Sequence, residues 1–99
     1  MYDVQLTKQA LKDATNIERA GLKPKAAEII KTVRKNPYDE SQGFEFLKYD
    51  LKGSCSRRIT LQHRFVYEVL ANTDGSKDAD GNLYDGIIKV ISMWTHYHE

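Results

Sequence analysis

The sequence predicts an α+β fold: a twisted antiparallel β-sheet with an N-terminal two-helix hairpin packed on one face. Three observations lead to this prediction. Apolar residues recur at helical spacing in the first third of the chain, and they alternate with polar residues in its second half. The strands expected in that half follow one another with short connections. With 99 residues, we expect one domain, 1–99, built around one modest core.

The first third of the chain predicts a strand followed by two helices. Tyr2–Leu6 alternates apolar and polar residues, as a half-buried strand does. Thr7 is a candidate N-cap for the first helix, and Gly21 is suited to its C-terminal end. Pro24 fits the first turn of a second helix, which Asn36-Pro37 ends. The connection is so short that the helices must form a hairpin.

Each helix carries an expected apolar stripe. In the first helix the stripe is Ala10, Leu11, Ala14 and Ile17. In the second helix it is Ala26, Ala27, Ile30 and Val33. Basic residues surround the second stripe: Lys23, Lys25, Lys31, Arg34 and Lys35. A basic helix face is most often simply solvated, and contact with RNA or the ribosome is the alternative.

The second half of the chain predicts a sheet. Strands are expected at Ser56–Leu61, Arg64–Leu70 and Gly86–Trp94, with a further short strand at Glu45–Lys48, because β-branched and aromatic residues are frequent there. Their order and short connections favour an antiparallel meander, with the helical hairpin on one face.

The segment 71–86 is expected to form an extended, exposed and acidic hairpin loop. It contains four aspartates against one lysine, together with glycine and asparagine. Its spacing partly resembles that of a calcium-binding loop, but Ala79 stands where such a loop requires glycine, so a solvated loop is preferred. The rest of the chain is mildly basic, which is compatible with a nucleic-acid partner.

Bulk composition limits the cellular compartments in which we expect the protein. No apolar run is long enough to cross a membrane and no signal peptide is evident, so we expect no membrane partner. The single cysteine, Cys55, has no internal disulfide partner, which fits a reducing cytoplasm. We interpret Cys55 as a small apolar filler rather than a nucleophile.

Strand alternation places two arginines on one surface. In Ser56–Leu61, Ile59 and Leu61 are expected to face the core, so Arg58 faces the other way. In the next strand, Arg64 lies opposite in parity to the apolar Phe65, so Arg58 and Arg64 could line one open face.

The residues gathered around 45–64 and at the C-terminus include the groups that metal-free RNA cleavage requires. A base takes the proton of the 2′-hydroxyl, cations stabilise the charge on phosphorus, and an acid protonates the departing 5′ oxygen. Simpler interpretations exist for each group. Arg57-Arg58 could be surface charge, Glu45 and Lys48 a solvated ion pair, and residues 96–98 a frayed tail. Alternate histidines with His63 could bind zinc, but no cysteine pattern supports a metal site.

The segment FLKYDLKGSCSRRITLQHRFVYEV, followed by His96-Tyr97, resembles the YoeB/Txe branch of the RelE-like toxins. The resemblance implies the RelE/YoeB-like microbial RNase fold and an endoribonuclease, without cofactor, that cuts messenger RNA in the ribosomal A site. It also implies inhibition by a YefM/Axe-like antitoxin in the bacterial cytoplasm, with the 70S ribosome and messenger RNA as further partners and a homodimer as an option.

The same resemblance implies roles for individual residues. Glu45 matches the general base and His96 the general acid, while Arg64 would stabilise the transition-state charge. The residues that would hold RNA are Lys48, Arg58 and Tyr97. The candidates for supporting roles are Arg57, Gln62 and His63.

Two departures from the family pattern stand out, and the first of them keeps a rival interpretation open. Gln62 stands where an acidic residue is usual, and the loop 71–86 is longer than the usual tight hairpin. The rival is a binding module that keeps the toxin fold and represses its own operon through its antitoxin complex without cleaving RNA. A relative that poisons DNA gyrase is a third option, but it would not need Glu45, Arg64 and His96 together.

Overall fold

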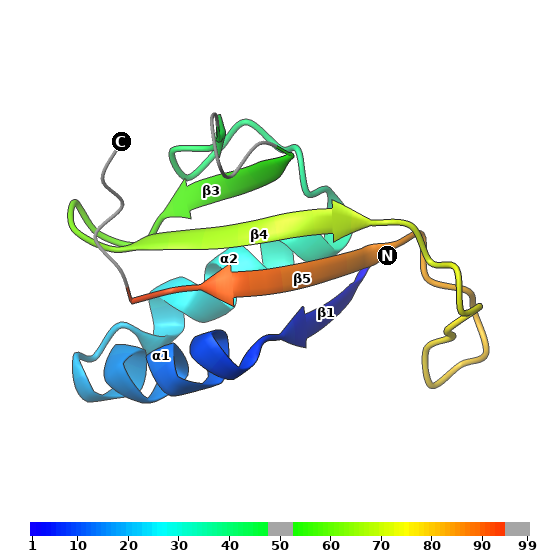
Figure 1. The fold of residues 1–99 in the computed structure, drawn as a ribbon, viewed down its shortest axis with the longest axis horizontal. Coiled ribbons are helices and arrows are strands. Elements are labelled where there is room, and N and C mark those ends of the chain that lie inside the picture. The colour runs from blue at the N-terminus through cyan, green and yellow to red at the C-terminus, as the bar shows by residue number, and fades with distance from the viewer. Residues whose placement is uncertain (48–52, 95–99) are drawn as a thin grey trace.

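The computed structural model describes residues 1–47 and 53–94, which form two helices and a five-stranded sheet (Figure 1). The elements are β1 (Asp3–Leu6), α1 (Lys8–Arg19), α2 (Lys23–Lys35), β2 (Glu45–Phe46), β3 (Ser54–Arg58), β4 (Arg64–Leu70) and β5 (Ile87–Ser92). The strands lie in the order β1-β5-β4-β3-β2. One core cluster contains side chains from both helices and from β3, β4 and β5, so the predicted α+β architecture is confirmed.

The sheet is mixed rather than wholly antiparallel. Strands β2 to β5 form the expected antiparallel meander. Strand β1 runs parallel to β5, with Asp3 opposite Ile87 and Leu6 opposite Val90. The helical hairpin carries the chain from β1 across one face to the far edge at β2, so the returning meander brings β5 alongside β1.

The first helix has the predicted ends and a narrower apolar stripe. The Thr7 hydroxyl accepts a hydrogen bond from the Ala10 amide at 3.1 Å, and Gly21 follows the helix with a φ of 73°. Ala10 and Ile17 are buried, but Leu11 is 59% exposed. The prediction that Leu11 faces the core is therefore wrong, because the position lies beyond the edge of the stripe that meets the sheet.

The second helix is rotated by about one position relative to the prediction. Its buried residues are Ala26, Ile29 and Val33, whereas Ala27 is exposed and Ile30 is half-buried. Adjacent isoleucines lie about 100° apart around a helix, so only one of the two can face the core fully. Ile29 is the residue that packs against the sheet, and the prediction that Ala27 lies in the core is wrong.

Strand β3 ends earlier than the alternation pattern indicated, at Arg58 instead of Leu61. The amides of Ile59 and Thr60 both donate to the His63 carbonyl, at 2.9 and 3.1 Å. The Thr60 hydroxyl accepts from the amides of Gln62 and His63, which closes a tight turn. Leu61 therefore lies at the tip of this turn, 92% exposed, and the prediction that it faces the core is wrong.

The loop 71–86 is held by its own polar side chains. The Asn72 amide group donates to the carbonyls of Ser76 and Tyr84, and the Asp78 carboxylate accepts from the amides of Asp80 and Asn82. These backbone hydrogen bonds, first that from Asn82, lower the pKa of Asp78. The loop extends from the end of β4 that is farther from Arg64 (Figure 1).

No helix in the described ranges is long and apolar enough to cross a membrane.

Candidate active site

Arg58 and Arg64 lie side by side on the open face of the sheet, which is the face on which the alternation placed both. They are direct partners in the antiparallel pairing of β3 with β4. Glu45 is paired with Ser56 in the same sheet, so its side chain projects to that face as well. The opposite face is occupied by the helices, and Phe65 and Tyr67 point into it. Residues from three adjacent strands therefore converge on one surface.

The guanidinium of Arg64 is held by three partners. Its Nε donates to the Ser56 hydroxyl at 2.9 Å, and one terminal nitrogen donates to the Gly43 carbonyl at 2.7 Å. The same nitrogen lies 3.5 Å from a Glu45 carboxylate oxygen. The Arg64 side chain is 14% exposed and that of Glu45 is 56% exposed. Arg64 is therefore oriented in advance, while the carboxylate remains open to solvent and to a ligand.

A short segment before β2 supports both arginines. The Arg58 amide donates to the Gln42 carbonyl at 2.7 Å, and Gly43 supplies the carbonyl that binds Arg64. Gly43 has a φ of 66°, and a Cβ atom there would lie 3.1 Å from the Cβ of Arg58. A side chain at this position would strain the backbone and press on Arg58, so glycine suits it.

The charges on this face favour an anionic ligand. Arg58 is exposed, and no described residue forms an ion pair with it. Among the residues that the structure describes, Arg64 forms an ion pair with Glu45 alone. Two guanidinium groups and one carboxylate leave the site positive, and guanidinium groups bind phosphate oxygens through paired N–H donors. In the described ranges, no group of three or more His, Cys, Asp or Glu side chains could hold a metal ion.

Arg57, the neighbour of Arg58, is fully buried on the helical side of the sheet. Its Nε donates to the Tyr67 hydroxyl at 3.1 Å, and its terminal nitrogens donate to the carbonyls of Ser41 and Pro37 at 2.9 and 3.1 Å. Its guanidinium carbon also lies 4.9 Å from the centre of the Phe44 ring. The interpretation of Arg57 as surface charge is therefore wrong. From behind the sheet, it binds the segment that carries Gln42 and Gly43.

A second buried polar side chain, Asp13, holds the chain just after the end of β5. This buried carboxylate on α1 accepts from the Met93 amide at 2.9 Å and from the Gln9 amide group at 2.9 Å. Met93 directly follows β5, at the start of the segment that leads to His96. The sequence pattern gave no reason to single out Asp13 or Ser56, because a polar residue within a helix or strand carries no information about its partner.

The remaining sequence candidates are distributed as follows. His63 is buried and its ring stacks on Trp94 with centres 3.9 Å apart. Gln62 is exposed in the turn between β3 and β4. Lys48, His96 and Tyr97 lie outside the described residues. Cys55 is 1% exposed and burial raises the pKa of its thiol, as expected for a filler rather than a nucleophile.

Comparisons with known proteins agree with this architecture. The sequence model of a family described as "YoeB-like toxin of bacterial type II toxin-antitoxin system" matches residues 6–97. Among curated relatives, Toxin YoeB of Escherichia coli O6:H1 is 49% identical over 45 residues and that of strain K12 is 47% identical. Each alignment covers 46% of this chain and 54% of the relative, so the chain spans about half the length of the curated relatives it matches.

Solved structures resemble the chain over nearly its whole length. The YoeB/ParE toxin from Agrobacterium tumefaciens has a TM-score of 0.74 at 29% identity, covering 96% of this chain and 99% of its own. A YoeB-YefM complex from Staphylococcus aureus contains a chain with a TM-score of 0.70 at 28% identity, covering 98% and 99%. A YoeB dimer from the same organism gives 0.69 at 29% identity, covering 99% and 98%.

Proposed function

Because the chain belongs to the YoeB-like toxins of bacterial type II toxin–antitoxin systems, we propose that it is a ribosome-dependent endoribonuclease that cuts messenger RNA without a metal ion. The observation that carries this proposal is the fixed Arg64 guanidinium, held by Ser56 and Gly43 beside an open Glu45 carboxylate. A cation oriented before substrate binds need not reorganise when negative charge develops on phosphorus. Because bacterial messenger RNA is translated on ribosomes in the cytoplasm, the proposed reaction takes place there.

The proposed reaction transfers the RNA phosphodiester to its own 2′ oxygen. Glu45 accepts the proton of the 2′-hydroxyl, and the 2′ oxygen forms a bond to phosphorus. Arg64 stabilises the charge on the phosphoryl oxygens, and Arg58 and Lys48 hold the flanking phosphates. The bond from phosphorus to the 5′ oxygen breaks, and His96 supplies the proton that this oxygen takes. The products are a 2′,3′-cyclic phosphate and a 5′-hydroxyl end.

Tyr97 would position the RNA by stacking against a base, as the family resemblance implies. Arg57 is assigned a positioning role, because its contacts lie behind the sheet and not on the open face.

The decisive experiment is cleavage of a translated message in a reconstituted translation system, mapped by primer extension. Arg64→Ala and Glu45→Gln should each reduce the cleavage rate by about 10²-fold or more, as loss of a charge stabiliser or a proton-transfer group does. Arg19→Ala removes an exposed arginine from α1 and serves as the matched control, with cleavage expected to be unchanged. Full cleavage by Arg64→Ala, with a native circular dichroism spectrum, would refute the assignment.

We further propose that the chain is neutralised by a YefM-like antitoxin and that it can form a homodimer. The YoeB-YefM complex and the YoeB dimer from S. aureus support both, since each contains a chain of the same fold that aligns over nearly all of this one. The rival function, a binding module without cleavage, is favoured by Gln62 in place of an acidic residue. Wild-type protein that binds the antitoxin but leaves every translated message intact would select the rival.

A further inference from the structure

Three aromatic rings meet at the edge of the sheet, next to Glu45. Tyr38 lies shortly after α2, and Phe44 and Phe46 flank Glu45 in the sequence. The ring centres lie 5.0 Å apart for Phe44 and Phe46, and 6.0 Å apart for Tyr38 and Phe46. The centres of Tyr38 and Phe44 are 6.5 Å apart. We call these three rings the edge cluster, because β2 is the last strand of the described sheet.

The edge cluster presents aromatic surface to solvent beside a charged site. Phe46 is 64% exposed and Tyr38 is 46% exposed. They are the only aromatic side chains in the described ranges that are exposed to this degree. A gathered apolar patch bordered by charge is typical of a surface that binds a ligand. The exposed rings therefore point to a ligand with an aromatic or apolar face.

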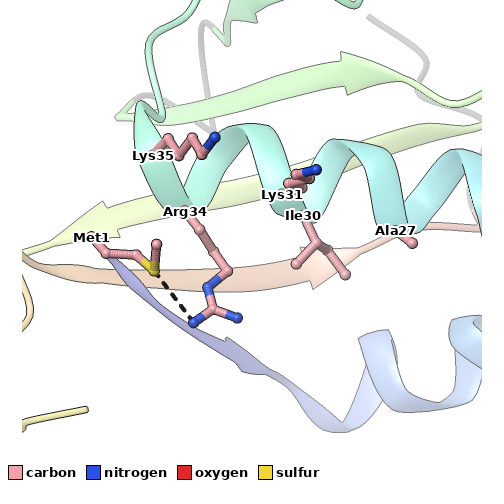
Figure 2. A pocket seen from close by; sticks show the side chains of 6 residues that line it. All are labelled: Met1, Ala27, Ile30, Lys31, Arg34 and Lys35. Atoms are coloured by element: carbon pink, nitrogen blue, oxygen red, sulfur yellow. Dashed lines mark hydrogen bonds between the residues drawn. The ribbon is translucent and has the colours of Figure 1, made fainter. Parts of the chain in front are cut away.

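Other hollows of the molecule are less suited to an aromatic ligand. The hollow on α2 contains no ring on which another ring could stack. It is lined by Met1, Ala27, Ile30, Lys31, Arg34 and Lys35 (Figure 2). Near the turn after β3, Trp94 and His63 stack on each other, so one face of each ring is already covered. Among the described surfaces, the edge cluster is the one best suited to stacking.

The edge cluster is anchored to the core before any ligand binds. Phe44 packs against the core, and the guanidinium carbon of Arg57 lies 4.9 Å from the centre of its ring. The rings of Phe44 and Phe46 meet edge to face at 76°, a favourable arrangement. Phe46 is also fixed by its pairing with Cys55 across the two strands. A ligand would therefore find the Phe46 ring already oriented and would lose little entropy in ordering it.

Strand parity places the edge cluster around the corner from the candidate active site. The Glu45 side chain projects to the open face with Arg58 and Arg64, whereas Phe44 and Phe46 have the opposite parity. In a single-stranded nucleic acid, the base and the phosphates leave the same sugar in different directions. A nucleotide whose sugar lies at Glu45 could therefore direct its phosphate to the arginines and its base over the edge of β2.

The charges around the edge cluster favour a base over a phosphate or an acidic peptide. Asp39 and Glu40 directly follow Tyr38, and their carboxylates would repel negative charge on that side. The cations Arg58 and Arg64 lie on the open face instead. A nucleobase is neutral, and every base has a π-face that stacks on an aromatic ring.

We propose that the edge cluster stacks a base of the message on the 5′ side of the cleaved bond, an inference that rests on the RNA cleavage proposed above. The 2′-hydroxyl that Glu45 would deprotonate belongs to the nucleotide on that side, and the Phe44 and Phe46 rings flank Glu45. This contact is separate from the stacking assigned to Tyr97. Because stacking tolerates any base, the edge cluster adds affinity for the message without selecting its sequence.

The test measures binding to ribosomes programmed with a message that has a 2′-deoxy nucleotide at the cut position. Such a message lacks the attacking hydroxyl, so co-sedimentation gives a dissociation constant without cleavage. Phe46→Leu, which keeps an apolar side chain but loses the ring, should raise this constant about 10-fold. Phe46→Trp should bind at least as tightly as wild type. Leu83→Ala, which removes a comparably exposed apolar side chain from the loop 71–86, is the control and should bind like wild type.

Two further messages test whether the contact is to a base. Each lacks the base of one nucleotide, either the first or the second on the 5′ side of the cut position. On one of these messages wild type should bind about 10-fold more weakly than on the intact message. Phe46→Leu should cause no additional loss on that message, because the two changes remove the same contact. Circular dichroism checks that every variant is folded.

Three results would overturn the proposal. The first is equal affinity of wild type and Phe46→Leu for the intact message. The second is a loss from Phe46→Leu that persists on both abasic messages, which would assign the edge cluster to the ribosome. The third is unchanged ribosome affinity with weaker binding of the antitoxin or of a second copy, which would assign it to a protein partner. Failure of the proposed enzyme activity is visible separately, as wild-type protein that binds these ribosomes but leaves an all-ribose message intact. In that case the dissociation constants alone would decide the role of the edge cluster.

Discussion

Replacing Arg57 tests whether a buried arginine behind the sheet holds the segment that supports the site. Three charge-assisted hydrogen bonds, at about 1.5 to 3 kcal/mol each, would together contribute about 5 kcal/mol or more. Two acceptors keep a second donor, however. The Pro37 carbonyl still accepts from the Tyr67 hydroxyl, and the Ser41 carbonyl from the Phe44 amide. Removal of the guanidinium therefore leaves a single acceptor, the Tyr67 oxygen, without its donor.

Replacing Arg57 with an apolar residue also removes the free-energy cost of burying its charge, which offsets part of the stability lost with its hydrogen bonds. No described carboxylate forms an ion pair with Arg57, so its charge is buried at a cost that an apolar side chain avoids. We expect Arg57→Met to lower the free energy of unfolding by about 3 kcal/mol. Arg57→Lys should cost about 1 kcal/mol more, because an ammonium stays charged, cannot reach the same acceptors and lacks the planar guanidinium that lies over the Phe44 ring.

Urea unfolding at neutral pH, followed by circular dichroism and by the single tryptophan, Trp94, measures these differences. Arg58→Met is the matched control, because it removes an exposed guanidinium from the same strand and should change stability by less than about 0.5 kcal/mol. The reasoning is refuted if Arg57→Met is no more destabilising than Arg58→Met, or if Arg57→Lys is the milder of the two substitutions at 57.

Three further predictions concern the core and its titration. Asp13→Ala leaves the buried Met93 amide without its acceptor. It should lower the free energy of unfolding, measured in urea, by about 2 kcal/mol. A change near zero would mean that Asp13 does not hold the end of β5. Gly86→Ala places a Cβ 2.8 Å from the Leu70 carbonyl oxygen. This overpacking should lower the free energy of unfolding by about 1 to 3 kcal/mol and so lower the melting temperature. An unchanged melting temperature would be the contrary result. Burial raises the pKa of Tyr67 to about 12 from 10.0. The neutral form of Tyr67 therefore contributes at most about 3 kcal/mol of stability below about pH 10, and this contribution is lost as the pH rises to about 12. Wild type should therefore lose more stability over this range than the Phe variant at 67, and equal losses would contradict the shift.

Local sequence signals located most of the elements correctly. The N-cap at Thr7 and the C-terminal glycine at Gly21 depend on neighbouring residues alone, and both were predictable. The placement of Arg58 and Arg64 on one face of the sheet also followed from strand alternation, whereas their direct pairing came from the structure. The errors at Leu11 and Leu61 arose where an apolar residue was assigned to the core although no partner surface reached it.

The sequence by itself determined the order of helices and strands and which arginines share the open face, because period and parity are properties of the local chain. Only the tertiary structure decided that β1 runs parallel beside β5 and that Ile29, not Ile30, meets the sheet. It also decided that one of two adjacent arginines is buried. Arg57 and Arg58 are identical as residues, and the pleat sends one toward the carbonyls of 37–41 and the other to solvent. Such contacts between distant segments cannot be read from sequence spacing. The residues that support the site could therefore be identified only from the fold.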